Sequence, residues 1–155
     1  MCWMCDHPDA TVQEWLEAIH ETVEKRGWAA QFVDSDRTPY AYTVGLHERG
    51  LPELLVTGLS PQPASHMLNS VAKYLVDGGK PIPGELISIG GGPLLEVVQV
   101  QQPDAHMDVA VAIYGTDLRA LQLVWPDDRG HRPWDPAFFN ENARQPVLGV
   151  RVGPT

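Results

Sequence analysis

The sequence predicts an α+β fold in which two main helices pack on a mostly antiparallel sheet, with a partly closed barrel as the alternative form of that sheet. The expected elements run helix, three strands, helix, strands, short helix and strand, without the regular alternation of a doubly wound sheet. The 14 prolines and 14 glycines imply short elements and frequent turns. The chain of 155 residues, 43% of them apolar, is expected to form a single domain, residues 1–155, with a substantial core.

The first helix is predicted over about residues 10–26. Asp9 or Thr11 can cap its start, and Gly27 is typical of a helix C-terminus. The apolar residues recur on one face at helical spacing, at Val12, Trp15, Leu16, Ile19 and Val23. This is an amphipathic helix that covers a core.

Three strands follow this helix. Aromatic and β-branched residues predict strands at residues 28–33, 40–46 and 52–59. The turn at residues 34–39 is rich in residues that bond their own backbone. The second and third strands are separated by the short turn at residues 47–50, so an antiparallel hairpin is expected.

The second half of the chain begins with another helix, which Ser60 caps and Pro61 opens. Asp77-Gly78-Gly79 ends it. Beyond it we expect strands at 85–89 and 94–100, a short helix within 104–114, and a strand at 119–125. Residues 145–152 are expected to add an edge strand.

The charge balance restricts the expected partners. Twenty acidic against 11 basic residues give a net charge of −9, and there is no Lys/Arg cluster. We therefore expect a small molecule or a protein as partner, and neither nucleic acid nor an anionic membrane surface. No apolar run approaches the roughly 18 residues of a membrane-spanning helix. The start lacks the basic and apolar regions of a signal peptide, which favours a cytoplasmic location.

The first eight residues, Met1-Cys2-Trp3-Met4-Cys5-Asp6-His7-Pro8, hold both cysteines of the chain. In the cytoplasm such a CxxC is more often a metal, redox or catalytic element than a structural disulfide. Cys2 and Cys5 can bind one soft or borderline cation, and His7 can supply a third ligand. The pattern predicts a zinc or iron site with another histidine, an acidic side chain or water in the fourth position.

Two other uses of this segment stay open. It precedes a predicted helix N-terminus, whose partial positive charge favours thiolates. Cys2 and Cys5 can therefore act as the attacking and resolving thiols of an oxidoreductase or transferase. Alternatively, Trp3 and Met4 anchor the segment to the core of a non-catalytic ligand- or partner-binding module. The sequence leaves open whether the protein is an enzyme.

Two loop histidines are candidate catalytic residues. His131 lies in a polar loop where Asp127 or Asp128 can orient its ring, and His47 lies in the turn after the second predicted strand. Either imidazole can carry a proton near neutral pH or complete the metal site. The simpler interpretation is that both are solvated turn residues, with Asp127 and Gly130 shaping the backbone.

Other candidates have simpler structural explanations. His20 and His66 are expected on helix surfaces. Gly90-Gly91-Gly92 lacks the Lys-Ser/Thr of a nucleotide-binding loop and predicts a hairpin turn. The aromatic residues at strand ends are expected in the core more than around a cofactor; they are Tyr42, Trp125 and Trp134.

Several motifs resemble those of a known family. They are the Cys-Trp-Met-Cys-Asp-His-Pro start, Tyr42-Thr43-Val44-Gly45-Leu46, the segment from Pro52 to Leu59, the segment from Leu121 to Asp127, Gly130 and Pro133-Trp134. With them the chain is similar, over most of its length, to a bacterial family, common in actinobacteria, that is known as a domain of unknown function. This resemblance implies membership of a family and no particular activity.

Overall fold

The computed structural model describes residues 8–33, 38–138 and 145–151. In this part of the chain six strands form one sheet in the order β1-β2-β3-β6-β5-β4. The strands are β1 (Ala29–Val33), β2 (Tyr40–Val44), β3 (Glu53–Thr57), β4 (Leu86–Ile87), β5 (Leu95–Gln99) and β6 (Ala120–Val124). Each predicted strand from 28–33 to 119–125 corresponds to one of these.

The sheet is mostly antiparallel, as predicted. The hairpin partners β2 and β3 are antiparallel, and so are the other neighbours except β3 and β6, which run parallel. The sheet is open, because β1 and β4 lie at its two edges. The α+β fold class is therefore confirmed in its open form, and the barrel does not form.

The helices in the described residues are α2 (Val12–Arg26), α3 (Pro61–Val76) and α4 (Asp108–Tyr114), with the short 3₁₀ turns η1 (Leu46–Arg49) and η2 (Pro103–Ala105). In α2 the Thr11 hydroxyl accepts from the Glu14 N–H, while the Glu14 carboxylate accepts from the Thr11 N–H. This reciprocal cap fixes the start of α2. Gly27 ends the helix at φ 96°, a left-handed conformation that favours glycine.

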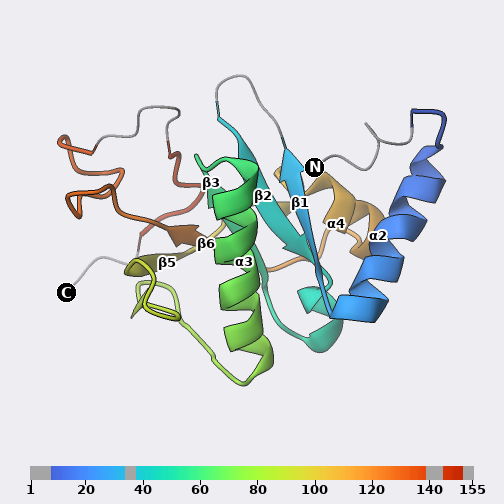
Figure 1. Ribbon diagram of the computed structural model, residues 1–155, viewed down its shortest axis with the longest axis horizontal. Coiled ribbons are helices and arrows are strands. Elements are labelled where there is room, and N and C mark those ends of the chain that lie inside the picture. Colours follow the sequence, from blue (N-terminus) through green and yellow to red (C-terminus); the bar gives the residue numbers. More distant parts are fainter. Residues whose placement is uncertain (1–7, 34–37, 139–144, 152–155) are drawn as a thin grey trace.

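Helices cover both faces of the sheet. One face packs against α3, whose Leu68, Val71 and Leu75 join Leu54 and Val56 of β3 and the apolar residues of β6. The other face packs against α2 and α4. Figure 1 shows α3 lying across the strands, with α2 at the opposite side of the view from the segment that follows β6. The architecture is a sheet between two helical layers.

The prediction of an edge strand at residues 145–152 is wrong, because the described part of this range, residues 145–151, contains no strand. The Gln122 side chain of β6 accepts from the Leu148 N–H at 2.7 Å and donates to the Pro146 carbonyl at 2.8 Å. Thr57 of β3 also donates to the Pro146 carbonyl. Polar side chains of the central strands β3 and β6 thus hold residues 145–151 in place. This segment does not extend either edge of the sheet.

The parallel pair β3–β6 defines two ends of the sheet. The η1 end is where β3 and β6 begin, and the loop end is where they finish. Five residues at about 3.3 Å each separate these ends by about 16 Å. The last turn of α2 lies at the η1 end, since a Cβ on Gly27 would lie 3.0 Å from the Arg49 guanidinium of η1. Its first turn therefore lies toward the loop end, about 22 Å away along the helix.

Candidate functional site

The segment after β6 forms a closed turn around the Asp127 side chain. Asp127 Oδ1 accepts from the Arg129 N–H at 2.9 Å and from the His131 N–H at 2.8 Å. The backbone closes the same turn, because the Asp127 N–H donates to the His131 carbonyl at 2.8 Å. Gly130 adopts φ 85°, where a side chain would be strained. The turn predicted from Asp127 and Gly130 is therefore present.

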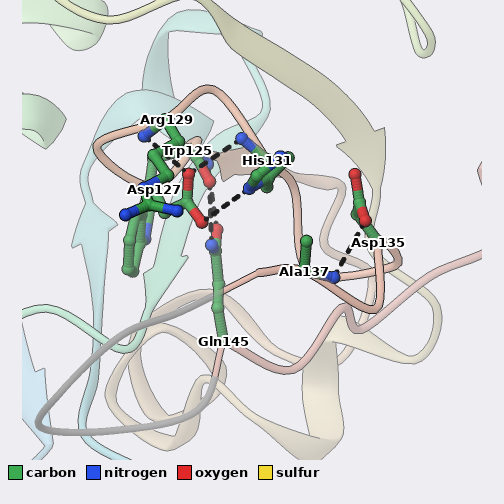
Figure 2. Close-up of polar contacts among 7 residues, drawn as sticks. All are labelled: Trp125, Asp127, Arg129, His131, Asp135, Ala137 and Gln145. Atoms are coloured by element: carbon green, nitrogen blue, oxygen red, sulfur yellow. Dashed lines mark hydrogen bonds and ion pairs between the residues drawn. The ribbon is translucent and has the colours of Figure 1, made fainter.

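The second carboxylate oxygen of Asp127 faces the imidazole of His131. Asp127 Oδ2 lies 3.4 Å from His131 Nδ1, and the Asp127 side chain is only 4% exposed. The His131 Nδ1 atom is itself buried and, within the described residues, makes this ion-pair contact but no hydrogen bond, while the ring as a whole is about one-third exposed. Figure 2 shows Asp127 between the backbone of Arg129 and the ring of His131. A carboxylate at Nδ1 favours the Nδ1–H tautomer and leaves the lone pair on Nε2.

Neighbouring side chains hold this turn against the sheet. Arg132 donates to the Val124 carbonyl at 3.0 Å and to the Leu94 carbonyl at 2.6 Å, which joins the turn to the ends of β6 and β5. Burial lowers the pKa of Arg132 from its usual value. Gln145 accepts from the Trp125 N–H and donates to its carbonyl, both at 2.9 Å. His131 therefore lies on a segment that hydrogen bonds from Arg132 and Gln145 fix to the sheet.

A cleft of about 360 Å³ opens beside the turn, lined by residues that include Trp134, Gln145 and Arg151. The Arg151 guanidinium stacks on the Trp134 ring at 3.5 Å. It also pairs with Glu96 through two bonds of 2.8 and 3.1 Å. Trp134 is exposed, so the expectation that it lies in the core is wrong, whereas Tyr42 and Trp125 are core residues as expected.

His47 lies at the other end of the sheet. It belongs to η1, its N–H donates to the Glu53 carboxylate at 3.2 Å, and its ring contacts Tyr114 at a centroid distance of 5.0 Å. η1 precedes β3, whereas His131 follows β6, so about 16 Å of sheet lies between their segments. The two predicted catalytic histidines therefore do not belong to one site.

Glu53 is a buried polar residue whose role the sequence did not reveal. Its side chain is fully buried within the motif from Pro52 to Leu59. It accepts from the Thr43 hydroxyl and from the N–H groups of Gly45, Leu46 and His47, at 2.8 to 3.2 Å. Burial raises the pKa of Glu53, and these four donors act in the opposite direction. The sequence signal for a special role was a charged residue within an otherwise apolar strand, since charged residues are rarely buried without partners.

The predicted metal ligands Cys2, Cys5 and His7 lie outside the described residues. Within residues 8–33, 38–138 and 145–151, no group of three or more His, Cys, Asp or Glu side chains is placed to hold a metal ion. His106 lies at the loop end of the sheet, on the face that α2 and α4 cover. The start of α2 lies on the same face and toward the same end. The His106 carbonyl accepts from the Tyr40 hydroxyl at 2.9 Å, where β2 begins, and Met107 packs in the α2–α4 core.

The remaining histidines are surface residues, as expected. His20 lies 3.1 Å from Glu24 on the exposed face of α2, and His66 is exposed on α3. Gly90 and Gly91 have φ of 61° and 76° and form the predicted turn before β5. None of the helices in the described residues is both long and apolar enough to cross a membrane.

Comparison with known proteins gives a family and no activity. Residues 22–139 match the model of a family described as a domain of unknown function, DUF4262. The matched range includes His47, Asp127 and His131, and it begins after Cys2, Cys5 and His7. No curated protein and no solved structure matches the chain.

Proposed function

The chain belongs to the DUF4262 family, a domain of unknown function, and on this premise we propose that His131, oriented by Asp127, is an acid–base group acting on a small molecule. The single observation that carries the proposal is the buried Asp127 carboxylate, whose second oxygen faces His131 Nδ1 at 3.4 Å.

The chemistry follows from the two ring nitrogens. With its proton on Nδ1, the imidazole presents the Nε2 lone pair as a base for an O–H or N–H group of the bound molecule. The imidazolium that forms is stabilised by the adjacent carboxylate, and Nε2–H can then return the proton. Positioned acid–base groups of this type typically contribute about 10² to 10⁴ in rate.

The Asp127→Asn variant tests this arrangement. The amide keeps an oxygen for the Arg129 and His131 N–H groups but presents an NH₂ group to Nδ1. We therefore expect the His131 proton to move from Nδ1 to Nε2, which ring ¹⁵N chemical shifts report directly. Asp128→Asn is the matched control and leaves the tautomer unchanged. An Nε2–H tautomer in the unmodified protein would refute the proposal.

A ligand test complements the tautomer test. A set of weakly acidic small molecules is titrated into the labelled protein while the His131 ring resonances are followed. We expect binders that shift these resonances in the unmodified protein and that bind more weakly to His131→Gln. If the binders that are found leave the His131 ring unaffected, this residue is not the acid–base group.

As a second candidate function, we propose that Cys2, Cys5 and His7 bind a transition metal, zinc or iron. The support is chemical: three soft or borderline donors lie within six residues, directly before the capped start of α2. A fourth position is open to a histidine, an acidic side chain or water. His106 is the candidate histidine, because it lies on the same face and at the same end of the sheet as the start of α2.

Elemental analysis of the full-length, untagged protein tests the metal proposal. We expect close to one metal ion per chain, lost in Cys2→Ser and in Cys5→Ser and retained in the His66→Gln control. Metal-free protein with a reversible Cys2–Cys5 disulfide would favour the thiol oxidoreductase or transferase. Metal-free protein with unreactive thiols would leave a non-catalytic binding module.

A further inference from the structure

A second cavity, of about 320 Å³, lies at the η1 end of the sheet, away from His131. It is enclosed by the segment before β3, the first residues of β6, the end of α3 and the connector that follows α3. Its size falls within the usual range for small-molecule sites. Nothing in the acid–base proposal uses it.

The charge of this cavity is opposite to that of the protein. The chain carries a net charge of −9, yet the charged residues that line the cavity are Lys80 and Arg119, with no carboxylate among the lining residues. In the described part of the chain neither cation pairs with an acidic group. Two exposed cations that line one cavity without an acidic partner favour an anion.

Arg119 is held in position for this task. One guanidinium nitrogen donates to the Gly50 carbonyl at 2.8 Å, which fixes the plane of the group. A guanidinium has five N–H donors in a rigid fork, so most of them stay available to a planar carboxylate. The Arg119 carbonyl accepts from the Glu53 N–H at 2.9 Å, so the backbone is anchored as well.

The remaining wall is mostly apolar, with Gln99 as its one other polar side chain. Leu51, Leu75 and Leu121 line the cavity together with three prolines, Pro52, Pro81 and Pro83. Proline fixes φ and so limits the ordering that a ligand must impose on the connector. An apolar wall beneath two cations suits a molecule with an anionic head and a short apolar body.

We propose that this cavity binds a small organic carboxylate, with the carboxylate at Arg119 and Lys80 and the apolar body against the leucines. This is a ligand site separate from the Asp127–His131 pair. It accounts for two cations that no acidic side chain of the described residues neutralises.

Titration with hexanoate, followed by amide chemical shifts of the full-length protein, tests the site. We expect saturable shifts centred on Gly50, Leu51, Gly79 and Leu121. 1-Hexanol, which has the same body without charge, should bind about tenfold more weakly or worse, because it forms no charge-assisted bonds. Equal binding of hexanol, or shifts centred elsewhere, would overturn the proposal.

Variants distinguish the effect of losing a cation from the effect of disturbing the fold. Lys80→Gln and Arg119→Gln should each weaken hexanoate binding by about threefold to tenfold. Lys73→Gln, an exposed lysine on α3 outside the cavity, is the matched control and should bind as the unmodified protein does. Arg119→Gln also removes the bond to the Gly50 carbonyl, so its effect on binding can be indirect. Lys80 makes no described contact that folding needs. Unchanged hexanoate affinity in Lys80→Gln would therefore count against the proposal.

Discussion

At the scale of single residues, Glu53 holds the turn between β2 and β3. Its Oε1 accepts from the Thr43 hydroxyl and the Leu46 N–H, and its Oε2 accepts from the N–H groups of Gly45 and His47. All four partners are donors, and the side chain is fully buried. A carboxylate satisfies them and an amide does not, because its NH₂ group would face two donors.

Glu53→Gln should therefore lower the free energy of unfolding by about 3 kcal/mol, since two buried donors lose their acceptor. Urea denaturation at pH 7 measures the loss. Asp128→Asn, at an exposed carboxyl in the loop after β6, serves as the control and should stay within about 0.5 kcal/mol of the unmodified protein. Equal stability of the two variants would contradict the role assigned to Glu53.

Tyr42 links stability to alkaline pH. Its ring is buried, its hydroxyl accepts from the Val109 N–H at 3.0 Å, and burial raises the pKa of Tyr42 above its usual value near 10. Above pH 10 the unfolded chain loses this proton while the folded chain keeps it, so stability falls as pH rises. Tyr42→Phe should show a shallower decline in urea denaturation between pH 9 and 11. Identical slopes would contradict this.

At the scale of elements, the segment 145–151 is held by side chains of the central strands. Gln122 contributes bonds to Pro146 and Leu148, and Gln145 bonds the backbone of Trp125. Gly149 approaches the Gln99 carbonyl so closely that a Cβ would lie 2.0 Å from it. Sequence periodicity indicated an extended segment here but not its position, because the side-chain bonds join residues 20 or more positions apart.

Gln122→Leu should release this segment. The substitution removes the acceptor for the Leu148 N–H and a donor to the Pro146 carbonyl. We expect amide exchange at Val147 and Leu148 to accelerate by about tenfold, while amides of β3 keep their protection. Hydrogen exchange by NMR measures both, and Gln62→Leu, at an exposed position on α3, is the control. Unchanged exchange at Leu148 would mean that other contacts hold the segment.

The elements themselves were predictable because local patterns determine them. The apolar stripe of α2, its cap at Thr11 and its end at Gly27 follow from residues within one helix. The pairing of Asp127 with His131 was also within reach of the sequence, since both lie in one short loop. Glu53 was not, because its donors come from the preceding turn and give no periodic signal.

At the scale of the whole molecule, the two proposed ligand sites lie at opposite ends of β6. Arg119 precedes the strand and Asp127 follows it, so about 16 Å of rigid sheet separates them. No sequence pattern predicted which residues of β3 share an end of the sheet with Arg119 and with Asp127, because that depends on β6 running parallel to β3. That pairing joins Glu53 to Ala120, far apart in the chain.

The two sites should therefore act independently. The change in hexanoate affinity caused by Lys80→Gln should be the same in the Asp127→Asn background as in the unmodified protein, within about 0.5 kcal/mol. A double-mutant cycle from the NMR titrations provides the measurement. A larger coupling energy would show that the sheet transmits a change between its ends.

The single parallel pairing also divides the sheet in terms of folding order. β1-β2-β3 and β4-β5-β6 are each joined by antiparallel pairings between strands that follow one another in sequence. Each half can therefore form with short loop closures, whereas the junction of β3 with β6 must close a loop of more than 60 residues. Contacts of such long sequence separation slow folding, so we expect the β3–β6 junction to form after the antiparallel pairings within each half.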